Sequence, residues 1–392
     1  MKFNDTKNAY VLKSDKELQK AYLLFRMISK RSWVRFGGKL TLLALRLGLP
    51  IHSLLRKTVY QQFCAGNEAQ DSLKVVNQLA AFNVKSYMHY AAESQKSEAG
   101  VEQSLQQFLN AVQFSKQNKA LPFVVFKPTA LGKVMLFEKV SAGIQLSKEE
   151  VASWDRTKDR INKCCAMAYA CQVRMLVDAE ESWLQNAIDA IVLDKMRAYN
   201  QKETFIFTTL QMYRKDRLEY LNSLLELSRK EGFKLGIKLV RGAYIEKENN
   251  RAEEKGYPSP ICSSKEATDD NFNLALNGIL NSLDHCELFL GTHSEDSVLR
   301  VLDFMKANQL APNDPRIWIS QLFGMADHIS FNLAKAGYQV VKYVPYGPLK
   351  EVIPYLIRRA EENTAVQGQT PRELELIQKE RNRRKTLKAE QK

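Results

Sequence analysis

The sequence predicts an α/β fold, a (β/α)8 TIM-like barrel with an N-terminal basic helical region. After about residue 80, eight short β-rich runs recur, separated by longer stretches of helix-like or polar sequence. Strands that alternate with helical stretches indicate parallel βα units, and eight such units within about 280 residues match the size of a (β/α)8 barrel. A doubly wound sheet is the competing fold, but it normally shows fewer strands before a domain change.

Residues 1–80 form the predicted basic helical region, since they contain no convincing strand. Between Leu18 and Asn67 there is no Asp or Glu, while nine Lys and Arg residues lie there, in a chain with a formal net charge of +14. This charge points to an anionic partner. The leucines and aromatic residues among the cations favour a helix that lies on a membrane surface or packs on the rest of the protein over nucleic-acid binding. A solvated helical face is the remaining alternative.

No apolar run reaches the ~18 residues needed to span a bilayer, because Arg46 and Pro50 interrupt the best candidate. The early acidic residues Asp5, Asp15 and Glu17 make the N-terminus a poor signal or transit peptide. We therefore expect a cytoplasmic protein, with peripheral contact at the inner membrane face through residues 18–67 as a further expectation.

The six cysteines show no CxxC spacing and no accompanying histidine cluster. We therefore expect neither a metal site nor a disulfide framework. A reducing compartment agrees with this cysteine usage.

The predicted barrel covers residues 81–368, and the predicted tail, 369–392, is charged and either frayed or helical. The eight strands are expected at VKSYMHYA (84–91), LPFVVFKP (121–128), CQVRMLVDAE (171–180), TFIFTTLQ (204–211), LGIKLVRG (235–242), CELFLGTH (286–293), RIWISQLFG (316–324) and YQVVKYVP (338–345).

Polar or hydrogen-bonding residues lie at the ends of seven of these eight strands. The active site of such a barrel lies at the carboxyl ends of its strands. Loops that begin there are polar in any case, so one such residue says little, but the set indicates a site. The residues are Lys127, Asp178, Gln211, Arg241, Gly242, Ala243, Thr292, His293, Gln321 and Tyr343.

Three of these residues have alternative interpretations. A lysine that ends a barrel strand, here Lys127, can be a Schiff-base nucleophile of a lyase. Asp178 begins the run DAEES and could simply cap a helix. His293 could equally be a rim histidine whose hydrogen bonds are satisfied.

The stretch IKLVRGAYIEKE, residues 237–248, combines positive charge with little side-chain bulk at a strand end. Lys238 and Arg241 supply the cations. Gly242 and Ala243 are small, which lets a ligand approach the backbone closely.

The last predicted helix of the barrel carries an apolar stripe and a pair of arginines. The stripe is Leu349, Val352, Ile353, Leu356 and Ala360. Arg359 falls on or beside this stripe, and an arginine there needs an anionic partner. With Arg358 next to it, the pair suits a carboxylate, because each guanidinium offers planar, bidentate donors. Phosphate is the competing ligand, although the sequence has no P-loop or GxGxxG after the first strand.

Taken together, these motifs resemble the proline dehydrogenase family in its stand-alone form. The motifs that carry the resemblance are LVDAEES, KLVRGAYIEKE, GTHSED, QLFGMADHISF and YVPYGPLKEVIPYLIRRAEEN, within residues 62–363. Members of this family are flavoenzymes that oxidise L-proline to Δ1-pyrroline-5-carboxylate. The resemblance implies FAD as cofactor, L-proline as substrate and a quinone as electron acceptor.

The resemblance also implies roles for the substrate side of the site. Arg358 and Arg359 are expected to hold the substrate carboxylate. Lys127 and Asp178 are expected to complete that ion-pair network, with Asp178 balancing the arginines. Tyr343 is expected to pack against the proline ring.

For the cofactor side, the resemblance places the cation of Lys238 near the flavin N5 and makes Asp178, Lys238 and Tyr343 the catalytic set. The expected FAD contacts are Ala179, Gln211, Val240, Arg241, Gly242, Ala243, Thr292 and His293.

Three other functions stay open on the sequence. The first is hydroxyproline oxidation on the same scaffold, although family members with that preference lack a tyrosine at the position of Tyr343. The second is a Schiff-base lyase that uses Lys127. The third is a membrane- or nucleic-acid-binding protein on an inactive barrel, with residues 18–67 as the binding segment.

Overall fold

The computed structural model describes residues 1–29, 37, 47, 51–91, 97–365 and 369–391. The chain divides into two compact units. The first unit consists of Met1–Ala92, His293–Leu302 and Ser320–Lys392, and the second unit consists of Glu93–Thr292 and Asp303–Ile319.

Eight strands form one sheet in the order β1-β8-β7-β6-β5-β4-β3-β2. The pairings β1–β8, β2–β3, β3–β4, β4–β5 and β5–β6 are all parallel. This order confirms the predicted (β/α)8 fold class, and each strand lies at the run predicted for it. The strands are β1 (Val84–Tyr90), β2 (Phe123–Phe126), β3 (Arg174–Val177), β4 (Ile206–Gln211), β5 (Leu235–Val240), β6 (Cys286–Gly291), β7 (Ile317–Leu322) and β8 (Val340–Tyr346).

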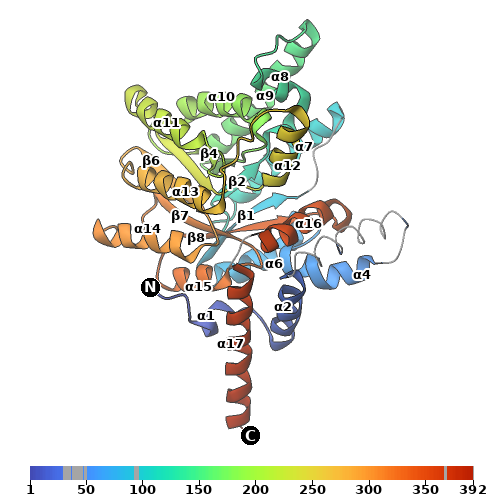
Figure 1. The fold of residues 1–392 in the computed structure, drawn as a ribbon, viewed down its shortest axis with the longest axis vertical. Helices are drawn as coiled ribbons and strands as arrows, with labels where there is room; N and C mark the ends of the chain where they lie inside the picture. The colour runs from blue at the N-terminus through green and yellow to red at the C-terminus, as the bar shows by residue number, and fades with distance from the viewer. Residues whose placement is uncertain (30–36, 38–46, 48–50, 92–96, 366–368, 392) are drawn as a thin grey trace. The chain divides into compact units, whose positions relative to one another are not determined.

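Helices precede and connect the strands (Figure 1). Before β1 lie α1 (Thr6–Ala9), α2 (Asp15–Ile28), α4 (His52–Leu55), η1 (Arg56–Tyr60), α5 (Gln61–Phe63) and α6 (Ala69–Ala80). After β1 lie α7 (Glu98–Lys116), η2 (Pro128–Leu131), α8 (Val134–Ser141), α9 (Lys148–Ala170), α10 (Ser182–Tyr199), α11 (Arg217–Glu231), α12 (Ile245–Lys255), α13 (Lys265–Leu280), α14 (Glu295–Ala307), α15 (Asp327–Lys335), α16 (Leu349–Ala365) and α17 (Gln369–Glu390).

The core of the second unit includes an aromatic layer centred on Phe123 of β2. Its ring lies edge-on to Phe289 of β6 and Trp318 of β7, with centroid distances of 5.0 Å in both cases, and to Phe207 of β4 at 5.8 Å. Parallel strands are buried on both faces and therefore read as nearly continuous apolar runs. That pattern is the signal from which the strands were predicted.

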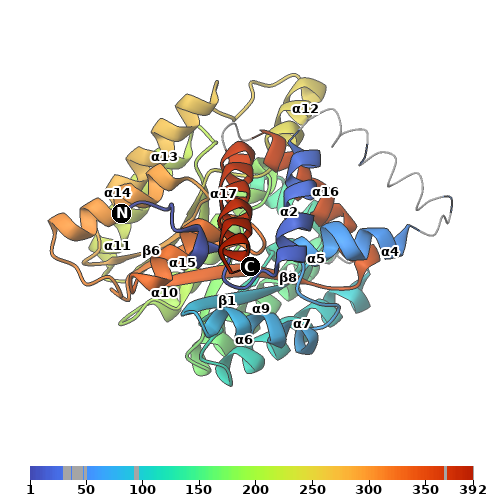
Figure 2. The ribbon, with the colours of Figure 1, turned by 90° about the horizontal axis from the view of Figure 1, so that it is seen from below.

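In the first unit, α2 packs against α16 and α17 (Figures 1 and 2). The helix begins at a capping box, in which Ser14 accepts from the backbone of Glu17 and the Glu17 carboxylate accepts from the backbone of Ser14. Leu18 and Phe25 lie on its buried face, within the same apolar cluster as Leu356 of α16. The described residues of the N-terminal region thus include the predicted helices, and one face of α2 packs on the C-terminal helices.

The basic segment 18–67 is described only in part. Lys20, Arg26, Arg56 and Lys57 belong to described helices. The predicted cations at 30, 31, 35, 39 and 46 lie outside the described residues. Within the part of the chain that the structure describes, no helix is both long and apolar enough to cross a membrane.

Helix α16 has the predicted apolar stripe. Leu349, Val352, Ile353 and Leu356 are all buried, while the side chain of Ala360 lies outside the described residues. After it, α17 shows that the predicted tail is helical, the second of the two alternatives.

Candidate active site at the carboxyl ends of the strands

In the second unit, the cation of Lys238 pairs with the carboxylate of Asp178. Lys238 lies within β5 and Asp178 follows β3, so the lysine side chain reaches past β4 to a strand two places away. Its Nζ lies 2.6 Å from Asp178 Oδ1, and the Lys238 side chain is 9% exposed. A buried charge is costly unless it is paired, so this contact stabilises both groups. Two members of the predicted catalytic set therefore lie together.

Lys127 follows β2 and contacts an aromatic side chain from another strand end. Its Nζ donates to the Tyr244 hydroxyl at 3.3 Å and lies 5.9 Å from the centre of the Tyr244 ring. Tyr244 precedes α12 in the loop that leaves β5. Tyr244 has no predicted role, because an aromatic residue in a loop carries no signal by itself.

Arg241, directly after β5, is held by groups from two other elements. Its Nε donates to Asp269 Oδ1 of α13 at 2.6 Å, and its NH1 donates to the Thr292 hydroxyl at 3.1 Å. The guanidinium also lies 4.2 Å from the centre of the Phe272 ring. Burial alone would raise the pKa of Asp269, but hydrogen bonds from Lys265 and Arg241 outweigh burial and lower that pKa. Arg241 and Thr292 thus come together as the predicted cofactor set requires.

Backbone conformation and packing both require glycine at position 242, and neither requirement was predicted from the sequence. Its φ is 126°, a backbone conformation that residues with a side chain rarely adopt. A Cβ atom on Gly242 would lie 1.5 Å from Cδ1 of Tyr213, whose side chain is fully buried. The sequence analysis explained this glycine by close approach of a cofactor, whereas the group that approaches it here is Tyr213.

Gln211, at the end of β4, connects that strand to the loop after β3. Its Nε2 donates to the backbone oxygen of Glu180 at 2.7 Å. The Glu180 carboxylate in turn accepts from the backbone nitrogen and the hydroxyl of Thr129, at 3.0 Å and 2.6 Å. Burial raises the pKa of Glu180. Ala179 is buried beside this network, and Val240 accepts a backbone hydrogen bond from residue 212.

In the first unit, Tyr343 of β8 is surrounded by aromatic rings. Its ring centroid lies 5.3 Å from Tyr87, 5.5 Å from His89 and 6.2 Å from Tyr355. Tyr343 pairs with Tyr87 across the β1–β8 ladder, so the sheet register fixes this contact. An aromatic cluster of this kind offers apolar ring surface.

Arg359 extends this cluster from helix α16. Its guanidinium carbon lies 5.4 Å from the centre of the Tyr355 ring, a cation–π distance. Tyr355 lies four residues before Arg359, so both occupy one face of the helix. Tyr355 is not among the predicted site residues. Its spacing of four residues from Arg359 could have identified it from the sequence. The side chain of Arg358 lies outside the described residues.

His293, at the start of the first unit's second segment, has a neutral imidazole. Burial, together with the positive charges of Lys342 and Arg359, lowers the pKa of His293 to about 3. Its Nε2 is 3.5 Å from the backbone nitrogen of Leu322. Its Nδ1 is buried and has no hydrogen-bond partner among the described residues. Buried polar atoms are nearly always hydrogen-bonded, so this nitrogen is a candidate for contact with a ligand.

The family model described as proline dehydrogenase matches residues 72–372 of this chain. The chain belongs to the proline dehydrogenase family. It is therefore an oxidoreductase of that family. The family membership predicted from the sequence motifs is confirmed.

Individual relatives agree with the family assignment. The chain is 34% identical to the carbapenem antibiotics biosynthesis protein CarD of Pectobacterium carotovorum over 82% of this chain and 83% of that protein. It is 31% identical to a hydroxyproline dehydrogenase of Xenopus laevis over 96% of this chain and 88% of that protein. It is 41% identical to the human mitochondrial proline dehydrogenase 1 over 59% of this chain and 39% of that protein.

Among solved structures, proline utilization A (PutA) of Bdellovibrio bacteriovorus has the same fold. The TM-score is 0.71 at 20% sequence identity, and the match covers 81% of this chain and 35% of that one. This chain thus spans well under half the length of both the human relative and PutA.

The sequence-predicted proline dehydrogenase residues fall into two described groups. The second unit brings Asp178 to Lys238 and Arg241 to Thr292. The first unit brings Arg359, a predicted substrate residue, to Tyr355, whose ring also contacts Tyr343. The catalytic, substrate and cofactor roles of these residues stay predictions.

Proposed function

We propose that this chain is an FAD-dependent proline dehydrogenase that oxidises L-proline to Δ1-pyrroline-5-carboxylate. The observation that carries the proposal is the placement of a guanidinium, that of Arg359, against an aromatic cluster within a chain of this family. Proline offers a carboxylate and a small apolar ring, and these two chemical features match the arginine and the aromatic cluster. Family membership also favours this reaction over a Schiff-base lyase at Lys127.

Substrate binding rests on the arginine pair of α16. Arg359 and Arg358 hold the carboxylate through charge-assisted hydrogen bonds, which are stronger than neutral ones. Tyr343 supplies the apolar surface against which the proline ring packs. Together these contacts fix the orientation of the ring carbon next to nitrogen, which is catalysis by proximity. The amine must be neutral when the hydride leaves, and its proton passes to solvent.

The described residues fit FAD at two points. The buried Nδ1 of His293 lacks a partner among the described residues and suits a polar group of the cofactor. Lys238 within β5 and Arg241 directly after it are cations, of the donor type that polar flavin and phosphate groups bind. Ala179, Gln211, Val240, Gly242, Ala243 and Thr292 complete the proposed cofactor set. When bound, FAD supplies hydride acceptance, the chemical step for which protein side chains have no group.

Charge balance explains the roles we assign to the acidic and basic residues of the second unit. Asp178 compensates the charge of Lys238, so the lysine can be held in a buried position, from which it would contact the flavin. Lys127 adds a cation at the end of β2 and contacts Tyr244. Asp178 serves to hold charge in place and does not act as a proton acceptor.

Hydroxyproline oxidation is the second candidate function. The observation that favours it is the long match to the Xenopus hydroxyproline dehydrogenase, over 96% of this chain. Tyr343 argues for proline, because its ring, packed between other rings, leaves less room for a hydroxyl on the substrate. We therefore place proline first.

The experiment is a direct comparison of the two substrates. The purified protein with FAD is assayed with an artificial dye acceptor, and the imine product is trapped with o-aminobenzaldehyde. The proposal predicts that kcat/KM for L-proline exceeds that for trans-4-hydroxy-L-proline at least tenfold. A preference for hydroxyproline would establish the second candidate instead, and no turnover of either substrate would refute both.

A quinone as the physiological acceptor is part of the same proposal. Its support is the family resemblance together with the cations of the N-terminal segment, which favour contact with an anionic membrane surface. The test is proline-dependent reduction of a short-chain ubiquinone by the purified protein. If turnover occurs with the dye but never with quinones, the acceptor is of another class.

A further inference from the structure

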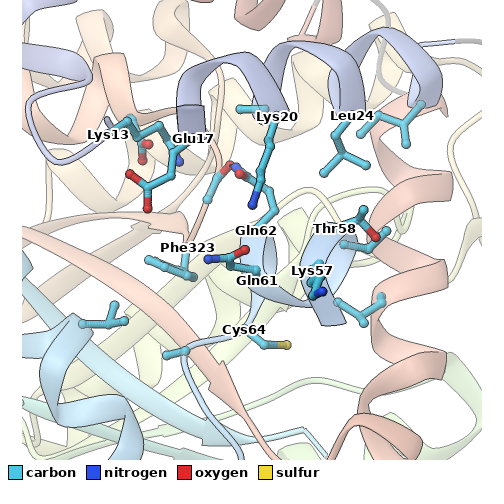
Figure 3. A pocket seen from close by; sticks show the side chains of 18 of the residues that line it. Lys13, Glu17, Lys20, Leu24, Lys57, Thr58, Gln61, Gln62, Cys64 and Phe323 are labelled. Atoms are coloured by element: carbon cyan, nitrogen blue, oxygen red, sulfur yellow. The ribbon is translucent and has the colours of Figure 1, made fainter. Parts of the chain in front are cut away.

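The first unit contains a cavity that is lined in part by α16. Its volume is about 800 Å³, and its walls come from α1, α2, α4, η1, α5, α6, α15 and α16 (Figure 3). Ile353, Leu356 and Ile357 of α16 line it. Neither Tyr355 nor Arg359 is among the residues that line it, so the cavity is distinct from the candidate substrate contacts. Its volume is typical of a small-molecule site.

The inner part of this cavity is apolar. Leu24 and Ile28 of α2 and Leu356 of α16 line it, and all three side chains are buried. Leu79 of α6 adds a further buried apolar group. A cavity wall of branched aliphatic side chains favours a hydrocarbon ligand over a polar one.

The apolar lining continues out to the protein surface. Leu23 and Met27 of α2 and Leu54 of α4 also line the cavity, yet they are 48%, 56% and 64% exposed. Large apolar side chains that gather in the open around a cavity mark an interaction site for a membrane or an apolar partner. The ligand can therefore extend from the interior to the surface without leaving apolar contact.

Four lysines line the same cavity: Lys13, Lys20, Lys57 and Lys74. In the part of the chain that the structure describes, none of them has a carboxylate within 4.0 Å. The two acidic residues of the lining are already engaged. The Glu17 carboxylate accepts from Ser14, and that of Asp327 lies 2.7 Å from Lys342 Nζ. The cavity therefore has an excess of positive charge, which attracts an anionic group.

We propose that this cavity takes one acyl chain of an anionic membrane phospholipid, whose phosphate group meets Lys20, Lys57 and Lys74. The apolar inner part of the cavity matches the acyl chain, and the lysines match the phosphate head group. The exposed apolar side chains around the cavity indicate that the lipid comes from a bilayer. A soluble anionic metabolite would not need the apolar wall, and a neutral hydrophobic molecule would not need the lysines. The inference goes beyond the proposed enzymatic function and does not depend on it.

The first experiment asks whether a lipid chain enters the cavity. Phe323 lines it and is half-buried, so Phe323→Trp places a fluorescent reporter there (Figure 3). The full-length protein is mixed with vesicles whose phospholipids carry bromine on the acyl chains, and the unmodified protein gives the background. We expect quenching with phosphatidylglycerol vesicles at least threefold stronger than with phosphatidylcholine vesicles.

The second experiment removes the charge and the space separately. Lys20→Glu with Lys57→Glu should weaken binding to phosphatidylglycerol vesicles at least ~10-fold, since each surface cation contributes to binding of an anionic leaflet. The matched control is Lys7→Glu with Lys16→Glu, two exposed lysines of α1 and α2 outside the cavity lining. Val75→Phe, on the half-buried wall from α6, fills space without adding a second fluorescent tryptophan, and it should abolish the quenching while the lysine-dependent binding persists.

Four outcomes would overturn the proposal. One is vesicle binding without quenching of the reporter, which would mean contact at the surface only. Another is equal quenching by both lipid head groups, and a third is an equal loss of binding in the control pair of variants. The last is quenching by free oleate with none by vesicles, which would exclude the bilayer as the source. Thermal unfolding of each variant shows that it is folded.

Discussion

Arg359 and Tyr355 form the most informative contact of the candidate substrate side. Their 5.4 Å cation–π contact fixes the guanidinium against a helix face whose neighbouring stripe is buried. The sequence predicted an arginine at the edge of an apolar stripe, because burial follows helical period. It did not predict the aromatic support, since that depends on which ring lies beside the guanidinium in the folded chain.

Replacing Arg359 by methionine should raise KM for L-proline. A hydrogen bond to a charged group contributes about 1.5–3 kcal/mol, so the loss corresponds to roughly 10- to 150-fold in KM. We expect a smaller change in kcat, because the carboxylate is bound in both ground and transition states. Steady-state kinetics measure both values. The control is Lys350→Met in the first turn of the same helix, which should stay within twofold of the unmodified protein.

His293 should make the protein less stable in acid. Its pKa is lowered to about 3 in the folded state, against about 6.5 when unfolded. Between these values the unfolded chain binds one more proton, so stability falls as pH decreases from 6.5, by up to about 1.4 kcal/mol per pH unit. His293→Gln removes this term. Urea unfolding at pH 7 and pH 5 should show a smaller loss for the variant, and equal losses would contradict the assignment.

At the scale of the element, the exit from β5 is built around Gly242 and Tyr213. The positive φ of Gly242 turns the chain out of the strand, and the Tyr213 ring fills the side where a Cβ would project. The loop that carries Arg241 and Ala243 therefore depends on a single glycine. A side chain at position 242 would disturb both the backbone conformation and the packing against Tyr213.

Gly242→Ala and Gly256→Ala separate these two effects. Gly256 also has a positive φ, 71°, but nothing lies within 4 Å of its Cβ position. Gly256→Ala should therefore cost only the backbone term, about 1–2 kcal/mol. Gly242→Ala should cost at least about 1–3 kcal/mol more, because Tyr213 must move. Urea unfolding of both variants tests this, and similar losses would show that Tyr213 yields easily.

The elements themselves could be predicted from the sequence because their signals are local. Buried parallel strands are short apolar runs, and the stripe of α16 follows the helical period. The contacts within the site are different, since Arg241 meets Asp269 and Lys238 meets Asp178 only after distant segments fold together. Residue types at strand ends indicated a site, whereas its pairings required the structure.

At the scale of the whole molecule, the sequence left two roles open for the basic helical region: packing on the rest of the protein, or lying on a membrane surface. Helix α2 has features of both. Leu18 and Phe25 pack within the first unit, while Leu23 and Met27 are exposed around a lysine-lined cavity. The formal charge of +14 is thus placed partly where an anionic surface can meet it. The family assignment rests on a match through 301 residues, 72–372, and the enzymatic proposal rests on that assignment.

The most direct test of the enzymatic proposal is anaerobic reduction of the bound flavin by L-proline. The purified protein, reconstituted with FAD, is mixed with L-proline without oxygen or any acceptor, and flavin absorbance near 450 nm is followed. We expect loss of the oxidised flavin band, at much higher proline concentrations for Arg359→Met and unchanged for Lys350→Met. Flavin that binds but keeps its absorbance at saturating L-proline would contradict the proposal.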